Sequence, residues 1–295
     1  MSTIEWRDVQ LNDKEMIDKL ICAGNCHNAD YSFANLYMWR HEYEPMIAIV
    51  GDRLIVGNPK WDSYSYPKGH GDLRQAIDSI IEDAHAKGSK AIIHDLTDRM
   101  LEEFLPIYGD RFELTEDRDN ADYLYTADKL CNLAGRKLSA KRNHINKFER
   151  NGDWEFLRIT DDNMATAKEF VAEFYKEKGD PDLESEAIAI AEMFANYHEL
   201  GFMGGLLYQN GKPVAFTAGT MLDPECADVH FEKALPDVEG AYTMVNREFA
   251  RMVASEHPSV EYFNREEDMG LEGLRKAKLS YHPDVLLMKY YAKEK

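Results

Sequence analysis

The chain has 295 residues, of which 44% are hydrophobic and 11% aromatic, and its formal net charge is −19. This composition excludes a disordered chain, and the length favours two domains of medium size, each able to bury its own core. The longest apolar runs are far shorter than the ~20 residues of a membrane helix. We therefore expect a cytoplasmic protein with reduced cysteines and no integral membrane association.

The first half of the sequence alternates short apolar strands with amphipathic helices. Its expected elements are a strand at 5–9, a helix at 14–21, a hairpin of 46–50 with 54–56, an extended stretch at 62–66, a helix at 73–84, a strand at 91–94, a helix at 98–105, and extended segments at 112–114 and 123–126. These elements predict an N-terminal domain at residues 1–127.

A basic segment follows the first domain. Residues 136–150 carry six Lys or Arg and one Glu, a net charge of +5, whereas the rest of the chain carries −24. We predict a helical connector at 128–152, in which Lys137, Lys141 and His144 form a stripe with Arg142 beside it. Such a stripe is suited to the phosphates of an aminoacyl-tRNA, but it is equally suited to ion pairs with the acidic domains.

The second half, predicted as a domain at 153–295, repeats this order of elements. Trp6 and Asp13 recur as Trp154 and Asp161, at an offset of 148 residues. Its expected elements are a strand from Trp154, two helices, a hairpin of 202–208 with 214–221 across Asn210–Gly211, a strand at 228–232, a helix near 242–252, a strand at 260–264, a helix at 271–279 and a strand at 285–291. The strands at 228–232 and 260–264, joined by a helix, must be parallel.

This succession is similar to the GNAT acyltransferase fold in tandem, an α/β fold of mixed sheets flanked by helices. The run NREEDMGLEGLRKAKLSY at 264–281, with residues 32–39, 122–137 and 141–148, resembles a family of soluble bacterial proteins that share the C-terminal domain of phosphatidylglycerol lysyltransferase. The resemblance implies an acyl or aminoacyl transferase with aminoacyl-tRNA as donor and a small-molecule or peptide amine or hydroxyl as acceptor. The alternatives are a coenzyme A-dependent N-acetyltransferase and a non-catalytic ligand-binding protein.

The same run supplies the candidate site in the second domain. Transfer from an activated ester requires a base near the acceptor and cations near the carbonyl oxygen. The catalytic candidates are Glu266, Asp268, Lys276 and Lys278; the substrate-binding candidates are Arg265, Arg275, Tyr281, Glu232 and Asn264; the donor-binding candidates are Lys137, Lys141, Arg142 and His144. The charged run also fits a solvated helix start whose acids and bases complement the helix dipole, and Tyr281 also fits a packed anchor.

Coenzyme A and metal ions are both disfavoured by the sequence. The loop at 233–240, where a pyrophosphate would bind, has one glycine and carries Asp237 and Glu239, which repel an anion. Cys22, Cys26 and His27 have no second Cys or His cluster at ligand spacing, so we expect no metal site.

Overall fold

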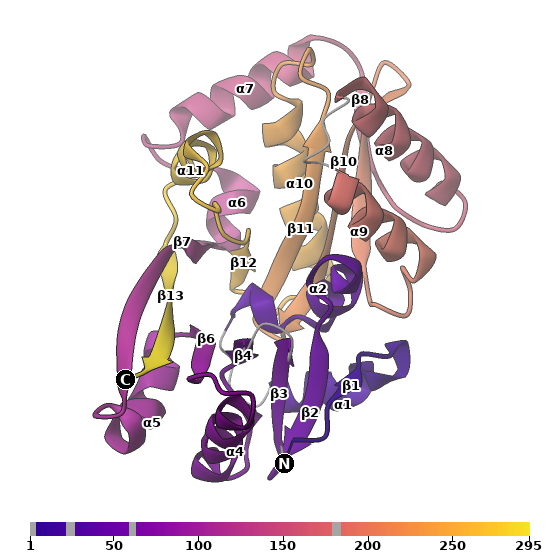
Figure 1. Cartoon of the computed structure of the whole chain (residues 1–295). Helices are drawn as coiled ribbons and strands as arrows, with labels where there is room; N and C mark the ends of the chain where they lie inside the picture. The colour runs from indigo at the N-terminus through magenta and orange to yellow at the C-terminus, as the bar shows by residue number, and fades with distance from the viewer. Residues whose placement is uncertain (1–3, 22–26, 59–62, 179–183) are drawn as a thin grey trace. The chain divides into compact units, whose positions relative to one another are not determined.

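A computed structural model describes residues 4–21, 27–58, 63–178 and 184–295 (Figure 1). The chain forms two compact units. Unit 1 comprises Met1–Asp122, Glu267–Gly270 and Leu286–Lys295, and unit 2 comprises Tyr123–Glu266 and Leu271–Val285. Within the described ranges every helix is too short or too polar to span a bilayer.

Unit 1 contains a mixed sheet in the order β1-β2-β3-β4-β6-β13-β7, with the short β5 paired to β3. Its elements are β1 (Arg7–Asp8), η1 (Leu11–Asp13), α1 (Lys14–Ile21), η3 (Ala29–Tyr31), α2 (Phe33–Met38), α3 (Arg40–Tyr43), β2 (Met46–Val50), β3 (Arg53–Asn58), β4 (Ser63–Ser65), β5 (Lys68–Gly69), α4 (Leu73–Ala86), β6 (Ile92–Leu96), α5 (Asp98–Tyr108), most of β7 (Phe112–Thr126) and most of β13 (Val285–Glu294).

Unit 2 contains the end of β7 followed by β12-β11-β10-β9-β8. Its other elements are α6 (Ala127–Asn132), α7 (Ser139–Arg150), β8 (Trp154–Arg158), α8 (Met164–Lys178), α9 (Glu184–Ala195), β9 (Met203–Gln209), β10 (Lys212–Asp223), β11 (Cys226–Ala234), α10 (Ala241–Glu256), β12 (Tyr262–Asn264) and α11 (Glu272–Leu279). The helix α10 packs along β9, β10 and β11 (Figure 1).

The mixed α/β fold and the order of its elements agree with the sequence expectations. The β9–β10 hairpin turns at Asn210 (φ 52°) and Gly211 (φ 75°), the two positive angles that a tight hairpin turn requires and that Asn-Gly supplies at little cost. β11 and β12 are parallel, as predicted for strands joined by a crossover helix. The two extended segments expected at 112–114 and 123–126 are parts of one strand, β7.

The division into units differs from the predicted contiguous domains, because the end of β7 belongs to unit 2 and most of the C-terminal strand β13 belongs to unit 1. The end of β7 pairs with β12 in unit 2, where Thr126 lies opposite Tyr262. The C-terminal strand β13 pairs with β6 in unit 1, where Tyr290 lies opposite Leu96. Residues 128–152, predicted as a separate connector, form α6 and α7 within unit 2.

A buried ion cluster accompanies β13 in unit 1. The ammonium of Lys289, which is 1% exposed, lies 2.7 Å from Oδ1 of the fully buried Asp122 and 2.5 Å from Oδ2 of Asp30. Burial alone would lower the pKa of Lys289, but the carboxylates of Asp122 and Asp30 outweigh it and hold that pKa well above its usual value. Lys289 therefore remains charged inside the unit.

Replacing Lys289 with Met leaves buried carboxylates without their cation. We expect the Lys289→Met substitution to lower the free energy of unfolding by about 3–5 kcal/mol, measured by chemical denaturation. Lys293→Met, on the same strand but exposed, should change it by less than about 0.5 kcal/mol. Equal stability of the two variants would contradict a structural role for the buried cluster.

Candidate functional site

The candidate site of unit 2 lies where β11 and β12 part. The two parallel strands pair only from Cys226–Tyr262 to Asp228–Asn264, after which β11 continues to Ala234 while the chain after β12 turns away (Figure 1). In sheets of this kind, ligands bind at such openings beyond the carboxyl ends of strands.

A β-bulge reshapes β11 at this point. Between the pairs Ala218–Phe231 and Thr220–Asp228, β10 has one residue and β11 has two, Val229 and His230. Bulges redirect side chains and occur often beside functional sites.

Hydrogen bonds from side chains and from the backbone hold the turn after β12. Oδ1 of the buried Asn264 accepts a 2.6 Å hydrogen bond from the Glu266 backbone N–H, and Glu266 itself has a positive φ of 56°. The ammonium of Lys278 donates to the carbonyl oxygen of Arg265 at 2.5 Å, and the Arg265 N–H donates to the carbonyl of Tyr123. The backbone that carries Arg265 and Glu266 is therefore fixed.

Arg265 and Glu232 form the centre of what we call the Glu232–Arg265 cluster, completed by Asn246, Tyr281 and Lys141. Nη2 of Arg265 lies 2.9 Å from Oε1 of Glu232, and the two side chains are only 14% and 10% exposed. Nδ2 of Asn246 donates to Oε2 of Glu232 at 2.8 Å. The guanidinium also lies 4.9 Å from the centre of the Tyr281 ring, a cation–π contact.

Lys141 reaches this cluster from α7. Its ammonium lies 3.7 Å from the centre of the Tyr281 ring. Burial, together with the positive charge of Arg265, lowers the pKa of Lys141 to about 8, and the carboxylate of Glu232 opposes part of this shift. Burial raises the pKa of Tyr281 to about 12, so its hydroxyl stays protonated at neutral pH.

Three buried polar atoms near Glu232 have no hydrogen-bond partner within the described part of the chain: Nη1 of Arg265, Oδ1 of Asn246 and Oγ1 of Thr217. Thr217 lies directly opposite Glu232 on β10. Because buried polar groups are nearly always satisfied, orphaned atoms of this kind indicate a place for polar atoms of a ligand or for water. The cluster therefore offers at least one strong cationic donor, Nη1 of Arg265, to a bound oxygen.

A second polar group lies on the bulge. Nδ1 of His230 lies 3.1 Å from Oε1 of Glu266 and 3.5 Å from Oδ2 of Asp228. Its other nitrogen, Nε2, lies 2.8 Å from Oγ1 of Thr220. The side chains of Asp228 and His230 are buried, whereas that of Glu266 is 24% exposed.

The remaining residues of the 264–281 run do not join either group. Asp268 belongs to unit 1, where its buried carboxylate accepts hydrogen bonds from Arg118 and the Gly270 N–H. Lys276 is exposed on α11 and Arg275 is half-exposed. Lys278 is buried, with its ammonium on the Arg265 carbonyl oxygen as described above.

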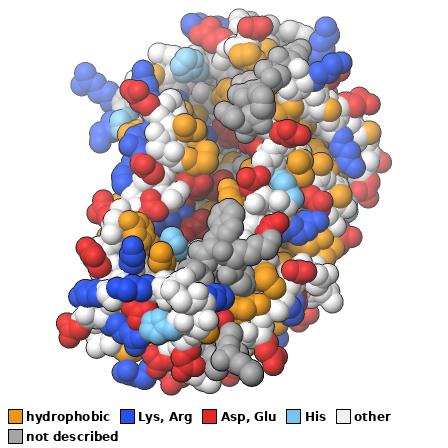
Figure 2. Space-filling model, in the orientation of Figure 1, with side chains coloured by type: hydrophobic (Ala, Val, Ile, Leu, Met, Phe, Trp, Pro, Cys, Tyr) orange, Lys and Arg blue, Asp and Glu red, His pale blue; other side chains and the backbone are white. Residues whose placement is uncertain are grey.

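The donor-binding candidates separate in the same way, and Lys137 lies in the turn before α7 and not on the predicted helix. Lys137 and His144 are exposed, whereas Lys141 points into the Glu232–Arg265 cluster. Arg142 donates to the carbonyl oxygens of Leu133 and Gly135. In Figure 2, Lys and Arg side chains project at the upper left, where Figure 1 draws α7, and others lie at the lower left and the right among scattered Asp and Glu.

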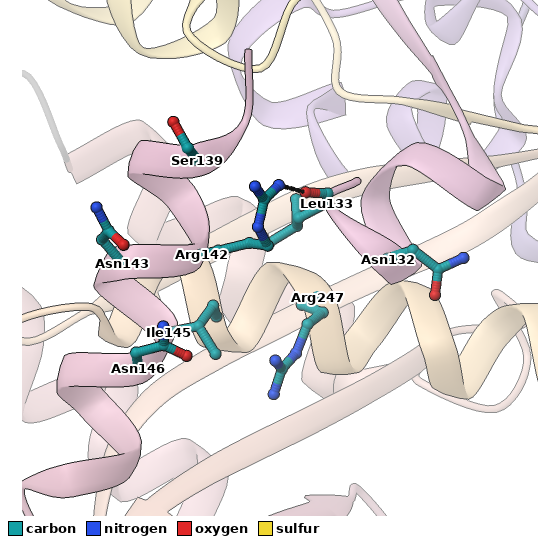
Figure 3. Close-up of a pocket in the computed structure, with 8 residues that line it drawn as sticks. All are labelled: Asn132, Leu133, Ser139, Arg142, Asn143, Ile145, Asn146 and Arg247. Carbon is teal, nitrogen blue, oxygen red and sulfur yellow. Dashed lines mark hydrogen bonds between the residues drawn. The ribbon is translucent and has the colours of Figure 1, made fainter. Parts of the chain in front are cut away.

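A small polar pocket of about 200 Å³ lies beside α7 (Figure 3). It is lined by Asn132, Leu133, Ser139, Arg142, Asn143, Ile145, Asn146 and Arg247. Arg142 reaches across it to Leu133, and Arg247 of α10 binds Glu149 of α7 and its neighbour Glu248. Both arginines therefore hold α7 to the elements around it.

The loop before α10 is closed by α7. A Cβ added at Gly240 (φ 87°) would lie 2.4 Å from the backbone oxygen of His144, so only glycine allows this approach. Asp237 and Glu239 are exposed on the same loop, and Glu239 pairs with Lys147 at 2.7 Å. A carbonyl oxygen and two carboxylates thus surround the position where a pyrophosphate would meet the helix N-terminus.

Sequence reasoning missed Thr217, Asn246, Asp228 and His230. For Asp228 and His230, the only signal in the sequence was that they and Glu232 are polar residues at every second position of one predicted strand. For Thr217 and Asn246, the sequence carries no signal, because their positions depend on pairing across β10 and packing of α10.

Three comparisons place this arrangement among known proteins. A family model described as "Phosphatidylglycerol lysyltransferase, C-terminal" matches residues 25–293. A conserved protein of unknown function from Bacteroides thetaiotaomicron is 37% identical, covers 99% of this chain and 100% of its own, and superposes with a TM-score of 0.90. The C-terminal domain of a putative lysylphosphatidylglycerol synthetase from Agrobacterium fabrum is 15% identical, with 97% and 93% coverage and a TM-score of 0.67.

Among curated proteins, an uncharacterized protein from Mycoplasmoides gallisepticum is 23% identical over 179 residues, which is 59% of this chain and 56% of that protein. The chain therefore aligns with little more than half the length of this relative. The family resemblance and the fold expected from the sequence are confirmed by the family model and the structural matches.

The charge of Glu232 should control the titration of Lys141. We expect Lys141 to titrate with a pKa of about 8, followed by NMR of its side chain as the pH is raised. Glu232→Gln should lower that pKa further, because it removes the carboxylate that favours the ammonium. Glu155→Gln, an exposed carboxylate on β8, should leave it unchanged, and an unshifted lysine in the wild type would contradict the buried geometry.

Proposed function

Because the chain belongs to the family of phosphatidylglycerol lysyltransferase C-terminal domains, we propose that it is an aminoacyl transferase that uses an aminoacyl-tRNA as donor and an amine or hydroxyl as acceptor. The observation that carries this proposal is the orphaned Nη1 of Arg265 beside Glu232, at the opening between β11 and β12. A buried cation with an unused donor is suited to an oxygen on which negative charge develops.

In the proposed reaction the acceptor amine or hydroxyl attacks the carbonyl carbon of the aminoacyl ester. The bond from that carbon to the ribose oxygen of the tRNA then breaks. The proton that the acceptor loses is taken up by the ribose oxygen, so the products are an amide or ester and free tRNA. Nη1 of Arg265 donates to the carbonyl oxygen, while Glu232 and the Tyr281 ring hold the guanidinium in place.

Lys141 is the proposed proton carrier. A lysine with a pKa of about 8 is partly neutral near physiological pH, so its amine can accept the proton of the acceptor and its ammonium can return it to the leaving oxygen. The exposed Lys137, just before α7, and the exposed His144, on α7, would meet the tRNA phosphates.

The loop before α10 favours this donor over coenzyme A. Asp237, Glu239 and the His144 carbonyl oxygen oppose a pyrophosphate at the N-terminus of α10, the place where backbone N–H groups would otherwise bind it. An aminoacyl-tRNA needs no pyrophosphate-binding loop at this position, because its phosphates are those of the tRNA backbone.

Removal of the Arg265 guanidinium tests the proposed function. Purified protein is incubated with tRNA charged with labelled amino acids and a panel of small amines, peptides and phosphatidylglycerol vesicles, and label leaving tRNA for the acceptor is measured. We expect transfer by the wild type, and a loss of about 10²–10³-fold in kcat/KM for Arg265→Met, the usual cost of losing one oxyanion donor. Lys212, exposed at the start of β10, provides the control, and Lys212→Met should retain wild-type transfer.

Lys141 should determine the pH profile of that transfer. The rate should rise with pH and level off above about 8, because only the neutral amine accepts a proton. Lys141→Met should lower the rate and abolish this rise. Transfer from acetyl-CoA instead of tRNA, or no transfer to any acceptor by a folded wild type, would overturn the proposed donor or the proposed activity respectively.

A further inference from the structure

We propose that Asp228, His230 and Glu266 form a site for one divalent first-row transition ion, of which Zn²⁺ is the test case. The three side chains come from β11 and from the turn after β12, and their candidate ligand atoms all lie within 4.8 Å of one another. This site is separate from the Glu232–Arg265 cluster, and it does not depend on the proposed transferase activity.

The distances fit a shared ion. Nitrogen and carboxylate ligands bind Zn²⁺ at about 2.0–2.2 Å, so two ligands at tetrahedral or octahedral angles lie roughly 3.0–3.5 Å apart. Nδ1 of His230 lies 3.1 Å from Oε1 of Glu266 and 3.5 Å from Oδ2 of Asp228. The third separation joins the carboxylate oxygens of Asp228 and Glu266. Small movements of the Glu266 side chain, which is partly exposed, can adjust it.

The hydrogen-bond partner of His230 favours Nδ1 as the atom that binds the metal. Nε2 lies 2.8 Å from Oγ1 of Thr220, so it can donate its hydrogen there and leave the lone pair of Nδ1 directed toward the carboxylates. Metal-binding histidines almost always have such a partner on their other nitrogen. The bulge at Val229–His230 supplies the local change of direction on β11.

The charge and chemistry of the site favour a transition ion. Two carboxylates converge on one imidazole, and both Asp228 and His230 are buried. An imidazole together with carboxylates suits Zn²⁺, Mn²⁺ or Fe²⁺ better than Mg²⁺ or Ca²⁺, which prefer oxygen ligands alone. Three protein ligands leave at least one position for water or a substrate atom.

No metal site was expected from the sequence, because Cys22, Cys26 and His27 have no second Cys or His cluster at ligand spacing. Cys22 and Cys26 lie outside the described residues. The three proposed ligands are separated by up to 38 residues, from 228 to 266, and no short spacing motif connects them.

Metal binding is tested on untagged protein that has been stripped with a chelator. We expect one Zn²⁺ per chain by titration against a chromogenic chelator, and visible d–d bands when Co²⁺ replaces Zn²⁺. Glu266→Gln and His230→Gln should each weaken binding by at least about tenfold and remove the Co²⁺ bands. Thr220→Val, which keeps the volume but removes the oxygen, should weaken binding by about tenfold through His230.

Two controls separate this site from adventitious binding. His198 and Asp161 form an exposed pair in the same unit, and Cys22 with Cys26 offers thiols, so His198→Gln and the double variant Cys22→Ser/Cys26→Ser should bind one Zn²⁺ as tightly as the wild type. Binding that survives Glu266→Gln in folded protein, or that is lost in either control, overturns the proposal. Glu266→Gln decides the result even if His230→Gln fails to fold, because Glu266 is partly exposed. Metal affinity is read without transfer, so failure here leaves the transferase proposal unaffected.

Discussion

The fixed turn after β12 is the constraint on which the site depends. Asn264 is completely buried and its side chain holds the Glu266 N–H, while the buried Lys278 holds the Arg265 carbonyl oxygen. These contacts force Glu266 into a positive φ, which costs a non-glycine residue roughly 1 kcal/mol or more. Because of this turn, Arg265 meets Glu232 while its neighbour Glu266 meets His230, so consecutive residues serve two separate polar groups.

The Glu232–Arg265 cluster combines a buried charge with an unused donor. A buried guanidinium is costly unless it is paired, and here one carboxylate and an aromatic ring compensate it. The pairing uses Nη2 and leaves Nη1 without a partner in the described structure. The same cation lowers the pKa of Lys141 after the larger effect of burial. A single arrangement thus supplies both an oxyanion donor and a lysine that exchanges protons near neutral pH.

Most secondary-structure elements could be predicted from the local sequence. The pairing of distant strands and the assembly of the site could not, for physical reasons. Period-two and helical patterns located most elements, such as α1 and the β9–β10 hairpin, because those signals are local. The pairing of the end of β7 with β12 and of β13 with β6 could not be predicted, since pairing between distant segments leaves no mark in either segment alone. Lys141, Glu232, Arg265 and Tyr281 were selected separately, as donor-binding and substrate-binding candidates, and the structure brings them together. Asp268 was adjacent in sequence but folds into unit 1.

The two units differ in how a buried cation is paired. Just past the last parallel strand pair, each unit has a non-glycine residue with positive φ, Asp95 in unit 1 and Glu266 in unit 2, as expected of repeated architecture. In unit 1 the buried Lys289 is bound by Asp30 and Asp122, so the chain itself satisfies its charge and the cluster stabilises the fold. In unit 2 the buried Arg265 retains an unused donor. Because an unsatisfied buried donor costs about 1–3 kcal/mol, Nη1 of Arg265 is a place for an oxygen atom of a ligand or of water.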